Sequence, residues 1–375
     1  MKKEPKEDVP IIQRHHLSVV SSAVLISTLL STQVHCADKA AEINTLRINQ
    51  EQNAKSGFQL AGYASFGYSY SEEDESNFDV VKFAPIFHYG YSDILQFEGE
   101  LEFSITQDGE TEVALEYAAA NLFLNNYMTL TAGQFMSPIG QFRQNFHPSW
   151  INKLPTAPVG FGHGGAAPTS NVGLALRGGL PRLFSLRHNY VIYVANAPTI
   201  AFAPDGDVDI GAEGMTSGNG TSATVGGRYA IDPLSGMEIG ISGAFGKAYD
   251  TNSSQGRDYN VFDVDFTYHT GGFDLRGEYV EQKIGTDEEL PIEGGKWQAA
   301  YGQIAYQFDA LHLEPVVRYG FYNNPEKEQK ETDLGLNYLF ANNIIAKFAY
   351  SFGDVTEGGD TESTDKYYAQ LAFGF

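Results

Sequence analysis

The sequence predicts an all-β fold, a transmembrane antiparallel β-barrel of about 16 strands with an inserted constriction loop. Three observations support this: the chain ends in an alternating strand that closes on Phe375, similar alternating segments recur from about Phe58 onward, and turn-forming residues separate them. Successive side chains of a strand point to opposite faces, so one face can meet lipid and the other water. Barrels of the outer-membrane type repeat this pattern in every strand.

The amino-acid composition fits such a barrel. The chain has 25 Phe, 22 Tyr and 40 Gly, which suit aromatic belts and tight turns. Its 47 acidic and 24 basic residues give a formal net charge of −23. An acidic chain repels phosphate backbones, so nucleic acid is not expected as a partner.

The first 36 residues predict a signal peptide. Basic residues precede an apolar stretch from Leu17 to Leu30, which is too short for a transmembrane helix, and cleavage is expected after Cys36. Residues 37–57 predict a periplasmic lead-in segment, and 58–375 the barrel. Because Cys36 is the only cysteine, the mature barrel is expected to have no disulfide.

Alternation and turn signals predict sixteen strands. The segments are 58–70, 78–90, 94–107, 110–124, 127–136, 171–180, 188–196, 221–231, 237–248, 258–269, 272–283, 296–308, 311–321, 331–340, 344–353 and 365–375. Short connectors alternate with longer ones, as periplasmic turns and outer loops do. The longer ones include Ser137–Ser170, Tyr322–Lys330 and Gly353–Thr364.

The connector Ser137–Ser170 is far less polar than the other loops. Its apolar residues include Ile139, Phe142, Trp150 and Phe161, and exposed loops seldom carry so many. We therefore expect it to fold inward and narrow the lumen; packing on the rim or on a neighbouring subunit is the alternative. Its aromatic side chains could stack on sugars or anchor the loop. The constriction-loop residues predicted from this segment are Arg143, His147, Trp150 and Lys153.

The face of each strand opposite the apolar one is expected to line the lumen. The acidic residues on these faces are Glu98, Glu100, Glu102, Glu112, Glu116, Glu238, Asp263, Asp265, Asp274, Glu278, Glu314 and Asp333. The basic ones are Lys82, Arg177, Arg228, Arg276, Arg318 and Lys347. Twelve acids against six bases predict a weak preference for cations, and a transverse field arises if the loop brings further bases to the narrowest point.

These features together resemble the Gram-negative outer-membrane porins. The segment Gly133-Gln134-Phe135-Met136-Ser137-Pro138-Ile139-Gly140 is similar to the strand-to-loop junction of the phosphate-selective porin group, although the arginine ladder of that group has no equivalent run here. The resemblance implies a water-filled channel for passive diffusion of small hydrophilic solutes and ions. It also implies a location in the outer membrane, contact with its lipid and lipopolysaccharide, and a homotrimer.

Other functions find less support in the sequence. His147, Ser149 and His163 share a loop, but a nucleophile elbow, a metal-spaced histidine cluster and a phosphate-binding loop are missing. No enzymatic activity, cofactor or metal is therefore expected. An anion- or phosphate-selective porin and a surface-binding barrel of the adhesin type are the alternatives.

Overall fold

The computed structural model describes residues 56–72, 75–78, 81–105, 109–183, 186–202, 208–211, 223–250, 256–285 and 295–375. The predicted signal peptide lies outside these residues, as does the lead-in segment except Ser56 and Gly57. These two residues already belong to the first strand, which begins two positions earlier than the sequence predicts.

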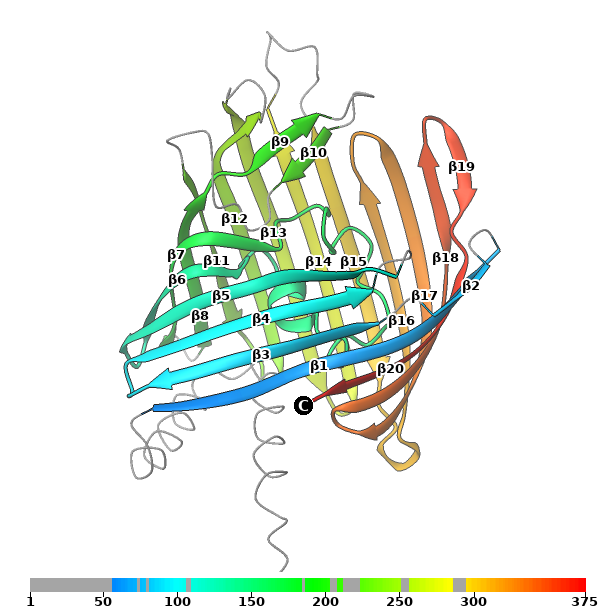
Figure 1. Ribbon diagram of the computed structural model, residues 1–375, viewed down its shortest axis with the longest axis horizontal. Coiled ribbons are helices and arrows are strands. Elements are labelled where there is room, and N and C mark those ends of the chain that lie inside the picture. Colours follow the sequence, from blue (N-terminus) through cyan, green and yellow to red (C-terminus); the bar gives the residue numbers. More distant parts are fainter. Residues whose placement is uncertain are drawn as a thin grey trace, which may run out of the picture.

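Within the described residues, sixteen long strands form one closed antiparallel barrel (Figure 1). They are β1 (Ser56–Ser71), β3 (Lys82–Tyr91), β4 (Leu95–Ile105), β5 (Thr111–Asn125), β6 (Met128–Met136), β7 (Ser170–Leu183), β8 (Leu186–Asn196), β11 (Ala223–Asp232), β12 (Met237–Asp250), β13 (Gly256–Thr270), β14 (Phe273–Ile284), β15 (Lys296–Tyr306), β16 (Leu313–Asn323), β17 (Lys327–Ala341), β18 (Ile344–Glu357) and β20 (Lys366–Gly374). β20 pairs with both β18 and β1, which closes the barrel. The predicted fold is confirmed.

Four short strands extend the connectors on one rim. β2 (Glu75–Asn77) pairs with β1, and β19 (Asp360–Ser363) pairs with β18. β9 (Thr199–Phe202) pairs with β10 (Val208–Gly211) and, over two residues, in parallel with β12. In the described part of the chain, no helix is long and apolar enough to cross a membrane.

Two of the connectors predicted to be long are instead tight hairpins. β16 and β17 pair up to Asn323 and Glu328, and Asn324 Oδ1 accepts hydrogen bonds from the backbone of the next turn residues. β18 likewise continues to Glu357 and turns directly into β19. The prediction was wrong because these strand ends are polar on both faces, so the apolar alternation that marks a strand in lipid is lost.

The two faces of the strands separate as the sequence predicts. In β16, Val317 and Tyr319 are about half exposed on the outside, whereas Arg318 between them is 1% exposed inside. Tyr117 is an exception, because the alternation predicts that it faces lipid. A register shift between Glu100 and Leu101, at the pairing of β4 with β5, turns Tyr117 inward, where it packs against a buried cluster.

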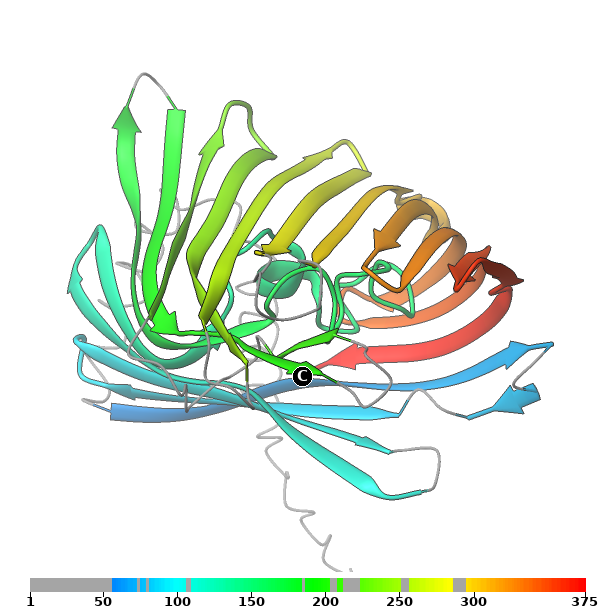
Figure 2. The ribbon, with the colours of Figure 1, turned by 90° about the horizontal axis from the view of Figure 1, so that it is seen from above.

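The connector between β6 and β7 lies inside the barrel (Figure 2). It contains the short π-helix η1 (Phe142–Phe146), whose two phenylalanines are buried. A second short helix, η2 (Asp309–Leu311), forms the turn before β16. The inward position of the long connector confirms the inserted loop, which is called the inner loop below (residues 137–169).

Candidate functional site

The inner loop first contacts the wall at β12–β14. The backbone N–H of Gly140 donates to Ser242 Oγ at 3.0 Å, and those of Gln141 and Phe142 donate to Glu278 Oε2 at 3.1 and 2.9 Å. Gly140 has φ +70°, and a Cβ there would lie 1.7 Å from Glu278 Oε1. The glycine is therefore required both by its dihedral angle and by this close approach.

The wall at this contact is acidic, and the acids are covered. The amide Nε2 of Gln141 donates to Glu238 Oε1 and Asp265 Oδ1, both at 2.8 Å. Arg228 donates to the same two carboxylates at 2.6 to 2.8 Å. The carboxylates are almost fully buried, as is Asp263 beside them. These carboxylates therefore interact with groups of the loop and the wall more than with water.

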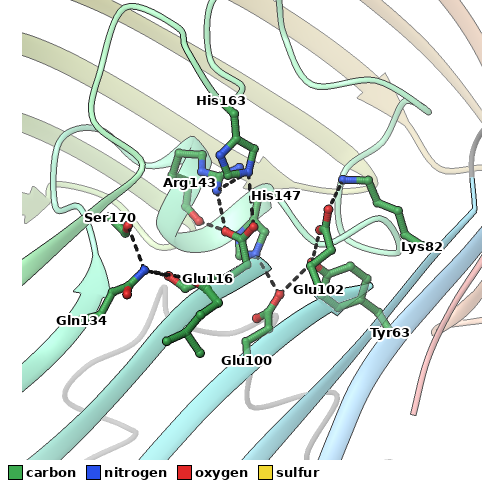
Figure 3. Close-up of polar contacts among 11 residues, drawn as sticks. Tyr63, Lys82, Glu100, Glu102, Glu116, Gln134, Arg143, His147, His163 and Ser170 are labelled. Atoms are coloured by element: carbon green, nitrogen blue, oxygen red, sulfur yellow. Dashed lines mark hydrogen bonds and ion pairs between the residues drawn. The ribbon is translucent and has the colours of Figure 1, made fainter. Parts of the chain in front are cut away.

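A second contact joins the inner loop to β4 and β5 (Figure 3). Arg143 Nη2 donates to Glu116 Oε2 at 2.8 Å, and His163 Nε2 lies 3.2 Å from Glu116 Oε1. His147 donates from Nδ1 to the carbonyl of Arg143, and its Nε2 lies 3.6 Å from Glu100 Oε1. Two predicted loop residues and two predicted lumen residues therefore meet here.

A third contact joins the loop to β16 and β17. Lys153 Nζ lies 2.5 Å from Glu314 Oε1, and Asn337 Nδ2 donates to the backbone carbonyl of Lys153 at 2.9 Å. The guanidinium of Arg318 donates to the carbonyl and hydroxyl oxygens of Thr156, and Arg318 Nε donates to Asp333 Oδ2 at 2.7 Å. Glu314 and Arg318, the two wall charges that the loop contacts, are buried, so loop groups satisfy them in place of water.

Lys347 on β18 holds the turn at the centre of the loop. Its ammonium, on a side chain only 1% exposed, donates to the carbonyl oxygens of Ser149, Asn152 and Leu154. Three donors meet three acceptors, which uses the full hydrogen-bonding capacity of the group. This base therefore stabilises the loop conformation.

Apolar side chains complete the anchoring. Phe142, Phe161 and Tyr301 form an edge-to-face cluster with ring centroids 5.0 to 6.3 Å apart. Arg276 stands 4.0 Å above the ring of Phe146. Trp150 is buried against β1, β3 and β20, where a side chain on Gly374 would overlap its indole ring. Burial assigns these aromatic residues to loop anchoring, the second of the two roles considered from the sequence.

Asp274 is also buried, where it pairs with Arg276 at 2.7 Å. The other predicted lumen residues are accessible. Lys82 is paired with Glu102 at 2.6 Å, with side chains 41% and 12% exposed. Arg177 lies 3.6 Å from Glu98, with side chains 43% and 22% exposed. Glu112 is exposed near the start of β5. Nine of the twelve acids on the inner faces are buried, which leaves these three acids and two bases, Lys82 and Arg177, open to water.

Sequence reasoning missed several residues that fix the loop. Gly140, Gln141 and Thr156 make wall contacts. From the wall, Asn337 on β17 donates to the carbonyl of Lys153, and Tyr63 on β1 donates to Glu100, which lies beside His147. Asn337 shares the inward parity of Asp333, which is a signal that could have identified it. Among the described residues, no three His, Cys, Asp or Glu side chains are placed to hold a metal ion.

Comparisons with known proteins support the fold. No protein-family model and no curated protein matches the sequence. Among solved structures, the chain is similar to the anion-selective porin from Comamonas acidovorans (13% identity, TM-score 0.59, 85% of this chain and 100% of that one). It is also similar to the outer membrane channel DcaP of Acinetobacter baumannii (10%, 0.60, 86% and 98%) and to OmpF of Salmonella typhi (16%, 0.54, 86% and 98%). The resemblance to outer-membrane porins is confirmed at the level of the fold.

Proposed function

We propose that this protein is an outer-membrane porin, a water-filled channel for passive diffusion of small hydrophilic solutes and ions. The observation that carries the proposal is the inner loop, which lies within a closed sixteen-stranded barrel and is bonded to β5, β12–β14 and β16–β18. A barrel of this size encloses an aqueous lumen, and a loop fixed inside it sets the free cross-section. In this proposal Arg143, His147 and Lys153 belong to the constriction.

The proposed ion preference is weak and in favour of cations. It is supported by exposed acids on the rim that carries the longer connectors, among them Glu110, Glu112, Glu357 and Asp360, which raise the local cation concentration. One observation favours the anion-selective alternative: two of the accessible charges of the lumen wall are the basic residues Arg177 and Lys82, with side chains 43% and 41% exposed. The sign of the reversal potential decides between the two.

The proposed location is the outer membrane of a Gram-negative bacterium, with its lipid and lipopolysaccharide as surroundings. Two of the solved structures named above are described as an anion-selective porin and as an outer membrane channel. A homotrimer is also proposed, because OmpT of Vibrio cholerae (11% identity, TM-score 0.55, 86% of this chain and 100% of that one) is described in a trimer form. We propose no catalytic activity, because His147 and His163 contact Glu100 and Glu116 where the inner loop is held against β4 and β5.

Planar-bilayer recording tests the proposal. Purified protein in a salt gradient is expected to give stepwise single-channel currents. It should also give a small reversal potential with the sign that indicates a preference for cations. An anion-directed reversal potential would select the alternative. Absence of any conductance step from protein that still shows the heat-dependent gel mobility of a folded barrel would refute the channel function itself.

A further inference from the structure

One acid–base pair on the open part of the inner wall is bridged by an amide. Arg177 on β7 and Glu98 on β4 approach to 3.6 Å between Nη2 and Oε1. Asn121 on β5 contacts both: its Nδ2 donates to Glu98 Oε1 at 2.7 Å, and its Oδ1 accepts from Arg177 Nη2 at 3.0 Å. Asn121 is fully buried, and Thr131 donates to the same Oδ1 at 2.7 Å. The amide therefore fixes the two charges side by side, and Arg177 and Glu98 are called the bridged pair below.

The bridged pair keeps hydrogen-bonding capacity on both of its charges. Arg177 donates to Asn121 through Nη2, so Nη1 and Nε retain their N–H groups. Glu98 accepts the amide on Oε1, and His88 Nδ1 lies 3.8 Å from its Oε2, beyond hydrogen-bonding distance. The side chains of Arg177 and Glu98 are 43% and 22% exposed. Donors and an acceptor of opposite charge are thus open to water next to each other.

Other acid–base pairs of the inner wall are closed on themselves. Lys82 Nζ donates directly to Glu102 Oε1 at 2.6 Å, and Arg143 Nη2 donates to Glu116 Oε2 at 2.8 Å. In such a direct contact the charged donor and the charged acceptor satisfy each other, which leaves less for a solute. The bridged pair differs because each of its charges makes its hydrogen bond to a neutral amide.

The bridged pair lies between the inner loop and the rim of the short turns. Glu98 is three residues after Leu95, where β4 begins, and Glu100 at the loop contact follows two residues later. At about 3.4 Å per residue, Glu98 is roughly 7 Å from that contact. A solute that has passed the loop on this side therefore meets the pair while it is still inside the barrel.

The chemistry of the pair selects a dipolar ligand. Its two formal charges cancel, so it has no net attraction for a lone cation or anion. A solute with an ammonium and a carboxylate a few ångströms apart can place its ammonium on Glu98 Oε2 and its carboxylate on Nη1 and Nε of Arg177. Both contacts are charge-assisted hydrogen bonds, which are stronger than those of a neutral polar solute of the same size.

We propose that Arg177 and Glu98, positioned by Asn121, form a binding site for zwitterionic solutes of the α-amino acid type. The inference rests on the proposed function and narrows its solute class. A weak site in the path raises the local concentration of the solute that it binds, and hence the flux at low solute concentration. Arg177 and Glu98 contact the solute, whereas Asn121 is a positioning residue.

Swelling of proteoliposomes that contain the purified protein tests the site with two isomers. Free alanine is a zwitterion, and lactamide has the same atoms without the charges. Wild type is expected to admit alanine about two- to thirtyfold faster than lactamide, the range given by two partly exposed ion pairs. The ratio should fall to near unity in Arg177→Gln with Glu98→Gln. Lys82→Gln with Glu102→Gln is the matched control, because it removes a closed pair from the same wall, and it should keep the wild-type ratio.

Asn121→Leu keeps both charges but removes the bridge, so Arg177 and Glu98 are expected to close on each other and the ratio to fall. A merely structural role of Asn121 would lower both rates and leave their ratio unchanged. A double variant with the wild-type ratio would overturn the proposal, as would full preference in Glu98→Gln alone, because Arg177 would then act without its partner. Equal entry of both isomers into wild-type vesicles refutes the site alone, whereas exclusion of both by a folded barrel refutes the porin proposal.

Discussion

The substitution Gly140→Ala should detach the inner loop from the wall at β12–β14. The new Cβ would lie 1.7 Å from Glu278 Oε1, so the carboxylate must leave its place. In doing so it gives up the hydrogen bonds from Gln141 and Phe142, each worth about 1.5 to 3 kcal/mol when the acceptor is charged. An alanine at φ +70° costs about 1 to 2 kcal/mol more.

The total cost to the attached state of the loop is about 4 to 8 kcal/mol. Since each 1.4 kcal/mol is a factor of about ten, even the lower figure reduces the equilibrium constant for attachment at this contact roughly a thousandfold. The other anchors, at Glu116, Glu314 and Lys347, remain. We therefore expect a folded barrel whose loop has one mobile end.

Single-channel recording measures the effect. Gly140→Ala is expected to give a larger mean conductance with frequent substates. Gly164→Ala is the matched control, because Gly164 lies in the same loop at φ +67° and a Cβ added there would have nothing within 4 Å, so it has the same dihedral cost without the collision. Wild-type conductance and noise in Gly140→Ala, or equal changes in both variants, would refute the reasoning.

Further predictions concern the other anchors and the accessible charges. Lys347→Met leaves three buried carbonyl groups without their donor and should cost about 2 to 5 kcal/mol, seen as an earlier heat-induced gel shift; an unchanged midpoint would show that the carbonyls find water. Trp150→Ala empties a packed site and should cost about 3 to 5 kcal/mol in a urea-unfolding series, and a loss below about 1 kcal/mol would contradict the packing. Arg177→Gln should shift the reversal potential toward cations, whereas Arg318→Gln, at a side chain 1% exposed, should leave it nearly unchanged in channels that still open. Equal shifts would mean that buried charges act on permeating ions as strongly as accessible ones.

The strands were predictable because lipid imposes a strict rule on them. Wherever a strand crosses the apolar layer, alternate residues must be apolar, and this signal located all sixteen long strands. The rule ends at the membrane surface. Lys327–Lys330 and Asp354–Glu357 are paired strand, yet both of their faces meet water, so nothing in their polarity separates them from a loop.

The inner loop was predictable as an inserted segment, but its contacts were not. Its apolar content indicated that it must pack against something, and burial of Trp150 and Phe161 agrees with this. The partners depend on which wall residue stands opposite each loop residue. Gln141 meets Glu238 and Asp265 across 97 and 124 positions of sequence, and one-dimensional alternation holds no information on that pairing.

The charge sum illustrates why the position of charges matters more than their number in the proposed channel. Along the inner faces acids outnumber bases by twelve to six in the sequence, but the acids under the inner loop are bonded to Arg143, Gln141, Lys153 and backbone N–H groups. A carboxylate that is covered by the loop and paired within it acts on a passing ion through a compensated dipole, whereas Arg177 and Glu98 act on it through water. The field along the path is therefore set by the few accessible residues and by the rim, and substitutions there should change selectivity while substitutions beneath the loop should change its position.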